Sequence, residues 1–175
     1  MKLLARFTFV LIALILSVAG VVHAENIAAT LTGYQEVPSV STVASGEFRG
    51  FINRNDDSID FELRYSGLQG TITQAHIHVG QLSVNGSIVI WFCQTATNPG
   101  PAGTPTCTPG SGTFTGTITE ANVVAGGTAS QQLAAGELDE VIRAIRAGAA
   151  YVNVHTSPLS PGGEIRGQIR ASARK

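Results

Sequence analysis

Three histidines are the residues of this sequence best suited to chemistry. His76 and His78 are two residues apart, and His155 lies in a later segment. Side chains two apart on a strand share a face, so His76 and His78 are expected to project together. Neutral imidazole binds zinc, copper, nickel or iron, and three imidazoles plus water form an open metal site. The sequence therefore predicts a copper or zinc centre, provided that folding brings His155 to the other two.

Two other interpretations of these histidines stay open. A His-x-His pair can form a hydrogen-bonding framework with loop carbonyls, and histidine is also the commonest general acid or base. The sequence contains no Gly-x-Ser-x-Gly, no His-Glu-x-x-His, no phosphate-binding loop and no dinucleotide fingerprint. No catalytic residue is therefore assigned, and the sequence favours a protein that is not an enzyme.

Four further polar residues are expected to support the histidine centre. Asn153 shares a strand face with His155. Glu36 either pairs with Arg166 or orients a histidine from behind. Glu164 and Arg166 alternate with apolar residues on the final strand, where they either bind a ligand or form a surface or cross-strand ion pair worth under about 1 kcal/mol.

Patterns of period two predict the strands that must position these residues. The clearest covers residues 58–65, where apolar and polar side chains alternate as they do on a half-buried strand. Turn-forming residues 55–57 precede it, so residues 46–53 are its expected hairpin partner. Further strands are expected at residues 28–33, 72–79, 87–92, 113–118, 150–156 and 164–170.

One helix is expected among the strands. It begins at Glu137, and its apolar residues recur at the spacing of a single helix face. Acidic residues crowd its first turn and basic residues its last, and Gly148 suits a left-handed cap. The whole pattern predicts an all-β fold, a Greek-key sandwich or barrel of the immunoglobulin-like or superoxide-dismutase-like kind, with one short helix covering an edge or open end.

The two cysteines, Cys93 and Cys107, flank a segment rich in Pro, Gly and Thr. Oxidation is the default for such a pair in an exported chain, and there is no Cys-x-x-Cys spacing of a redox or metal motif. We therefore expect a structural disulfide that closes an exposed loop over residues 94–112.

The first 24 residues predict export. Two basic residues precede an apolar run over residues 7–22, and residues 22–24 suit signal-peptidase cleavage before Glu25. The run is shorter than the roughly 20 residues of a membrane-spanning helix. We expect residues 1–24 to be a signal peptide and residues 25–175 to be one soluble domain, periplasmic or extracellular, with no membrane association after cleavage.

Loss of that segment removes His23 and two basic residues. The remaining chain carries 9 basic and 12 acidic residues, a net charge of −3, and its histidines are the three described above. Phosphate contacts dominate nucleic-acid affinity, so this balance excludes a strongly basic nucleic-acid binder.

Several motifs, taken together, resemble the CHRD (chordin) domain family in its secreted bacterial form. They occur in the family's order and span residues 26–170, and they are Leu31–Pro38, Ala75–Gly80 with Asn85-Gly86 after it, Gly148–Thr156 and Pro161–Gln168. The resemblance implies an exported β domain. The characterised animal member antagonises growth factors, but no residue of this chain identifies such a partner.

Two functions of different classes follow. The first is a secreted binding or structural module for an extracytoplasmic protein or surface ligand. The second is a small copper- or zinc-binding protein that uses His76, His78 and His155 in metal handling or redox defence. The histidine pair, barrel and disulfide are similar in kind to copper/zinc superoxide dismutase, but that family uses six histidines and an aspartate, so full dismutase activity is not expected.

Overall fold

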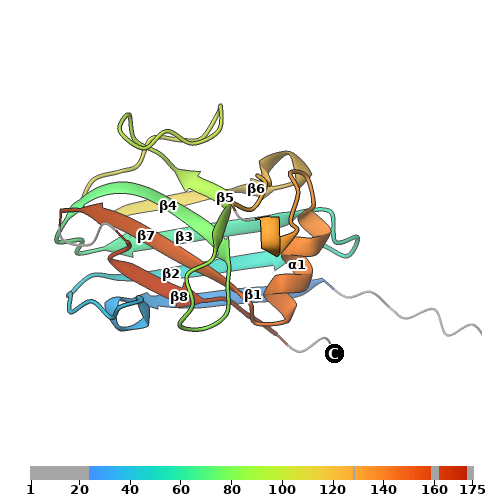
Figure 1. Ribbon diagram of the computed structural model, residues 1–175, viewed down its shortest axis with the longest axis horizontal. Helices are drawn as coiled ribbons and strands as arrows, with labels where there is room; N and C mark the ends of the chain where they lie inside the picture. The colour runs from blue at the N-terminus through green and yellow to red at the C-terminus, as the bar shows by residue number, and fades with distance from the viewer. Residues whose placement is uncertain (1–23, 128, 159–161, 173–175) are drawn as a thin grey trace, which may run out of the picture.

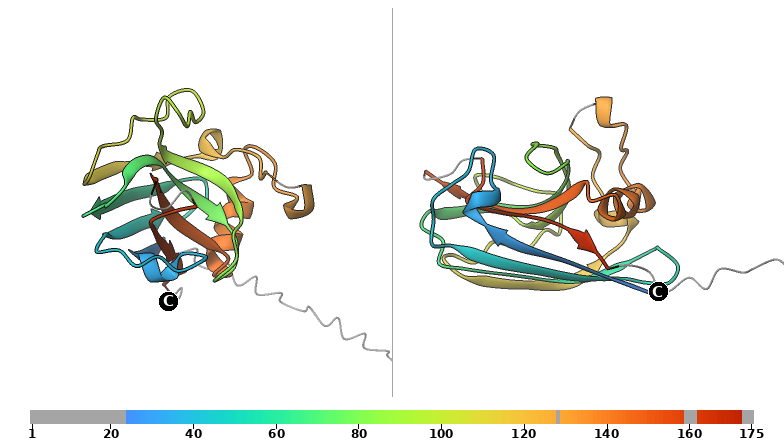
Figure 2. Two further views of the ribbon diagram at one scale, coloured as in Figure 1. Left: turned by 60° about the vertical axis from the view of Figure 1, so that its left-hand side comes forward. Right: turned by 90° about the horizontal axis from the view of Figure 1, so that it is seen from below.

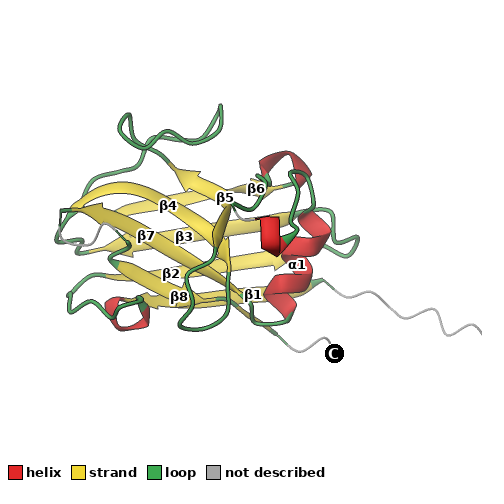
Figure 3. Cartoon of the chain, in the orientation of Figure 1, coloured by secondary structure: helices red, strands yellow, loops and turns green. Residues whose placement is uncertain are grey.

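The computed structural model describes residues 24–127, 129–158 and 162–172, and the predicted signal peptide lies outside them except for Ala24. Within these ranges the chain forms one antiparallel sheet that curls into a nearly closed barrel (Figure 1). The neighbours run β5-β4-β7-β8-β1-β2-β3-β6, and β9 pairs with β1. The prediction of an all-β sandwich or barrel with one helix is confirmed (Figure 3).

The strands lie close to the predicted ranges. They are β1 (Glu25–Thr32), β2 (Ser45–Ile52), β3 (Ile59–Ser66), β4 (Thr71–Val79), β5 (Ser87–Cys93), β6 (Gly112–Ile118), β7 (Ala150–Ser157), β8 (Ile165–Gln168) and β9 (Arg170–Ala171). Short 3-10 helices cover Gly33–Gln35, Glu120–Asn122 and Ala129–Gln131.

The single final strand expected at residues 164–170 is wrong in one respect, because it is divided at Ile169. The Ile169 side chain is fully buried, and its N–H donates to the Ala150 carbonyl of β7. β8 pairs with both β7 and β1, and β9 continues the pairing with β1.

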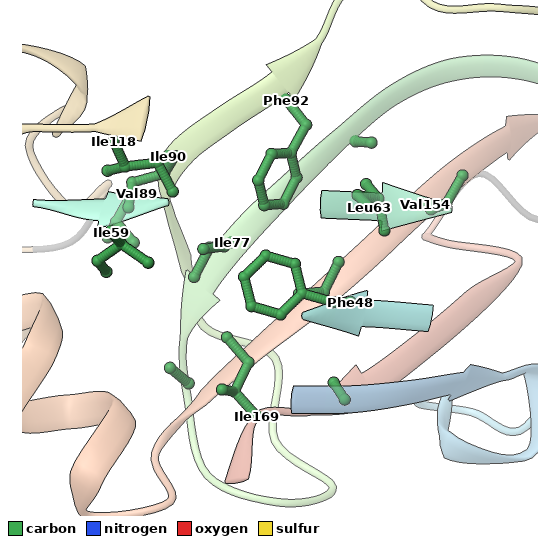
Figure 4. Packing of buried hydrophobic residues seen from close by; sticks show 14 of the residues in the cluster. Phe48, Ile59, Leu63, Ile77, Val89, Ile90, Phe92, Ile118, Val154 and Ile169 are labelled. Atoms are coloured by element: carbon green, nitrogen blue, oxygen red, sulfur yellow. The ribbon is translucent and has the colours of Figure 1, made fainter. Parts of the chain in front are cut away.

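The apolar core lies between two layers of the barrel, β1-β2-β3-β6 and β5-β4-β7-β8 (Figure 2). Phe48 of β2 and Phe61 of β3 contact Phe92 of β5 from the opposite layer, with ring centroids 5.7 and 4.8 Å away. Figure 4 shows Phe48 and Phe92 among aliphatic side chains from both layers. Alternation on β2 and β3 produces this arrangement, because their register pairs Phe48 with Leu63 on the inward face.

Helix α1 (Leu138–Arg146) lies at one end of the barrel (Figures 1 and 2). Its four predicted apolar residues, Leu138, Val141, Ile142 and Ile145, are all buried. Gly148 has a φ of 68°, which matches the predicted left-handed cap. No helix among the described residues is long and apolar enough to cross a membrane.

The pairing of β4 with β7 positions the histidines. The register places His76 opposite Asn153, His78 opposite Tyr151 and Gln74 opposite His155. Ala75, Ile77, Val152 and Val154 point into the core and are fully buried. The intervening polar side chains therefore project together from the outer face of this strand pair.

The predicted disulfide is present between Cys93 at the end of β5 and Cys107, with a Cα–Cα distance of 4.9 Å. It closes the loop between β5 and β6. Gln94 ties this loop internally, because its backbone N–H donates to Pro105 and its carbonyl accepts from Cys107.

Replacing both cysteines with alanine is expected to lower the free energy of unfolding by about 3 kcal/mol, because the unfolded chain regains the entropy of a 14-residue loop. Urea denaturation of wild type and variant, both without the signal segment, measures the difference. A stability change below about 1 kcal/mol would contradict a structural role for the bridge.

Candidate metal centre

Three imidazoles meet on the outer face of the β4–β7 pair. The ring centroids of His76, His78 and His155 are 5.3, 5.1 and 5.8 Å apart. One nitrogen from each ring lies within 4.8 Å of the nitrogens of the other two. Residues almost 80 positions apart in the sequence thus form one cluster, because antiparallel pairing sets His155 two residues along β7 from Asn153, which lies opposite His76.

The histidines are buried, although the sequence places them on an outward face. The exposed fractions are 0% for His76, 6% for His78 and 8% for His155. A strand face that points away from the apolar core is therefore not exposed at this place. Alternation predicts correctly that the histidines point away from the apolar core, but it says nothing of the side chains and loop that cover them.

Two of the rings leave nitrogens without hydrogen bonds among the described residues. Neither nitrogen of His76 has a partner, and Nε2 of His78 has none. Buried polar groups are nearly always satisfied, so such atoms call for an explanation such as a ligand or water. Nδ1 of His78 lies 3.0 Å from the Gly86 carbonyl oxygen. A carbonyl can only accept, so Nδ1 carries the proton and the Nε2 lone pair is free to bind a cation.

Both β4 histidines are held in the neutral form that metal binding requires. Burial, together with the neighbouring His155 and His78, lowers the pKa of His76 to about 2. Burial also lowers the pKa of His78 to about 4, although the bond to Gly86 opposes this. At neutral pH these rings present lone pairs in place of competing protons.

Two aromatic residues flank the cluster. The Trp91 ring of β5 meets the His76 ring edge to face, with centroids 4.2 Å apart. The Tyr151 ring lies parallel to the His78 ring at 4.6 Å, and the Tyr151 hydroxyl accepts a hydrogen bond from the Gly86 N–H. Gly86 thus contacts both members of the Tyr151–His78 stack, which fixes the plane of the His78 ring.

Neither aromatic residue was identified from the sequence as part of the site. Tyr151 carries a signal, since it shares the strand face of Asn153 and His155. Trp91 carries none, because its position opposite His76 depends on register shifts between β4 and β5.

Glu36 and Asn153 form a buried pair behind the histidines. The Asn153 side-chain amide donates to both Glu36 carboxyl oxygens at 3.1 Å. Gly163 makes room for this pair, because a Cβ there would lie 2.5 Å from a Glu36 oxygen. Burial raises the pKa of Glu36 to about 7, against the opposing effects of Asn153 and Arg166.

Arg166 of β8 is fully buried and caps the stack. Its guanidinium carbon lies 3.4 Å from the centre of the Tyr151 ring, a cation–π contact. It also donates to the carbonyls of Gln81 and Val84, which fixes the loop between β4 and β5. Among the described residues no ion pair joins Arg166 to Glu36 or to Glu164, so the expected surface ion pair on the final strand is wrong.

Glu164 neither pairs with Arg166 among the described residues nor lies in the histidine cluster; its contacts are hydrogen bonds to loops and to β7. It accepts hydrogen bonds from the Thr42 and Thr156 hydroxyls and from the backbone N–H groups of Gln69 and Gly70. Although burial opposes its charge, these bonds hold the pKa of Glu164 below its ordinary value. Glu164 therefore ties the loops that contain Thr42 and Gln69–Gly70 to the end of β7, and nothing in its contacts points to a ligand.

The cluster can hold one cation with small adjustments. Nitrogens bound to one ion at about 2.0–2.1 Å lie no more than about 4 Å apart, so closure by about 1 Å suffices. His76, His78 and His155 are the candidate ligands. Asn153 and Arg166 touch groups around them, and Glu36 acts through Asn153.

The comparison with protein families places the chain in a class. A family model for the CHRD domain matches residues 27–169, most of the β domain described above. The chain belongs to the CHRD domain family. That membership and the disulfide are consistent with an exported protein. A comparison with curated proteins finds no match, and neither does one with solved structures.

The buried neutral histidines make the metal-free protein sensitive to acid. Below about pH 6.5 the unfolded chain binds protons that the folded His76 and His78 exclude. The free energy of unfolding therefore decreases as the pH is lowered. Glu36 acts in the opposite direction, because its raised pKa makes the folded state bind a proton between about pH 7 and 4.5. The net expected loss is about 2 kcal/mol between pH 7 and pH 5, measured by urea denaturation at each pH.

The variant Glu36→Gln is the matched control for this prediction. It removes the offsetting carboxyl and is expected to double the loss to about 4 kcal/mol over the same range. Equal stability of the Glu36→Gln protein at the two pH values would show that the histidines titrate normally.

Proposed function

We propose that this CHRD domain is an exported metal-binding protein that holds one copper or zinc ion with His76, His78 and His155. The observation that carries the proposal is the mutual approach of three buried ring nitrogens to within 4.8 Å. The hydrogen-bonding framework considered from the sequence has weaker support. His76, the most buried of the three, makes no hydrogen bond among the described residues.

The surroundings of the cluster support the same proposal. The bond from Nδ1 of His78 to the Gly86 carbonyl is the kind of outer contact that orients metal-bound imidazoles. Three neutral nitrogen ligands with no thiolate suit zinc or copper. A role in metal handling or redox defence fits a domain exported by a signal peptide over residues 1–24, and the disulfide supports export because such bonds persist in oxidising compartments.

The competing proposal is a binding or structural module without a metal. Loop residues 94–111 favour it, because a disulfide-pinned loop rich in Pro, Gly and Thr can present a surface to an extracytoplasmic partner. The two proposals differ in what the histidines do. In a module without a metal, replacing a histidine changes stability alone.

Trp91 provides a direct test, since it is the single tryptophan of the chain and contacts His76. Titration of copper into metal-free, tag-free protein is expected to quench Trp91 fluorescence with an endpoint of one ion per chain and a dissociation constant of micromolar or below. The same ion is expected to raise the melting temperature, because it binds only the folded state.

His155→Ala is the informative variant, because it removes one ligand and leaves the Trp91–His76 contact in place. It is expected to weaken copper binding at least about 100-fold and to abolish the melting shift. Thr115→Ala, on the exposed side of β6, is the control and is expected to bind as wild type does. Wild-type protein that binds neither copper nor zinc at micromolar levels would rule out the proposal.

A further inference from the structure

The charges around the histidine cluster distinguish a monovalent ion from a divalent one. The group of residues able to share an ion contains three imidazoles, which bind metals in their uncharged form, and no carboxylate among the described residues. A divalent ion bound there keeps its full charge within a buried region. The cost of burying an ion grows with the square of its charge, so a site of this kind penalises divalent ions more heavily.

A permanent positive charge lies close to the same cluster. The Arg166 guanidinium carbon is 3.4 Å from the centre of Tyr151, whose ring is stacked at 4.6 Å on His78. The guanidinium is therefore within about 8 Å of the His78 ring, and arginine stays charged in proteins. Arg166 is fully buried, and its hydrogen bonds go to the carbonyls of Gln81 and Val84 and to the Asn85 side chain, which are all uncharged.

Glu36 is an acidic group that contacts Asn153 beside the cluster, and it opposes Arg166 only in part. It reaches the centre through the Asn153 amide and is not among the residues that could share the ion. Because burial raises its pKa to about 7, a substantial fraction of Glu36 is uncharged at neutral pH. The hydrogen bonds of Arg166 go to uncharged groups, and no carboxylate belongs to the group of residues able to share the ion, so its positive charge is not cancelled by a direct ion pair among the described residues.

We infer, building on the proposed function, that this centre selects monovalent copper over divalent zinc and divalent copper, and that Arg166 enforces the selection. Copper(I) has a filled d shell and accepts three neutral ligands without a further anion. Repulsion by Arg166 is twice as large for a divalent ion at the same place. The ligand class of the site is thus a reduced copper ion, supplied to the protein in that state.

The selection is tested by comparing dissociation constants for different ions on one protein. Copper(I) is titrated without oxygen, in the presence of a reductant mild enough to spare the disulfide, against a chromophoric copper(I) chelator. Zinc and copper(II) are titrated against chelators suited to each. Wild type is expected to bind copper(I) at least about 100-fold more tightly than zinc.

Two substitutions of opposite electrostatic sign separate charge from structure. Arg166→Met removes the positive charge and is expected to reduce the copper(I)-to-zinc preference about tenfold, whereas Glu36→Gln is expected to increase it. Arg166→Lys keeps the charge and is expected to retain the preference. A purely structural role for Arg166 would weaken the binding of every ion equally, and the ratio would not change.

The outcomes also separate this inference from the proposal on which it rests. Wild type that binds zinc or copper(II) as tightly as copper(I) overturns the selection and leaves the metal centre intact. The same conclusion follows if the copper(I)-to-zinc preference is unchanged in both Arg166→Met and Glu36→Gln. Wild type that binds none of the three ions overturns both.

Discussion

The register between β4 and β7 is the constraint on which the site depends. It fixes three imidazoles within contact of one another, and it does so on a strand pair whose other face is packed into the apolar core. A shift by one residue would exchange the two faces, placing histidines in the core and valines outside. Packing of the apolar core therefore fixes the β4–β7 register, and this register places the three imidazoles next to one another.

Both faces of this strand pair are consequently buried, for different reasons. The inner face is covered by hydrophobic side chains from the opposite layer of the barrel. The outer face is covered by Trp91, by Tyr151 under Arg166 and by the loop that Arg166 fixes between β4 and β5. Glu164 fastens further loops at the end of the same strands through four hydrogen bonds. A polar layer that is closed in this way lowers the pKa of His76 and of His78, so both rings are neutral at neutral pH and can bind a cation.

The fold was largely predictable because alternation of apolar residues is a local signal. The pattern from Ile59 to Tyr65 and the helix face from Leu138 to Ile145 each specify an element without knowledge of the rest. The same reasoning gave the shared face of His76 and His78. It could not give the approach of His155, because a register between distant strands depends on the assembled sheet. It also missed the burial of Arg166 and the roles of Trp91 and Glu164. These depend on strand register and on the conformation of loops, which the periodicity of the sequence does not predict.

X-ray absorption spectroscopy of the copper(I)-loaded protein, recorded at the copper edge, tests the central claim most directly. It reports the type and number of ligands without assuming where the ion sits. Three nitrogen neighbours with the outer-shell scattering of imidazole, reduced to two in His155→Ala, are the expected result. Sulfur ligands, fewer than two imidazoles, or a spectrum unchanged by removal of His155 would contradict a centre built by the β4–β7 pairing.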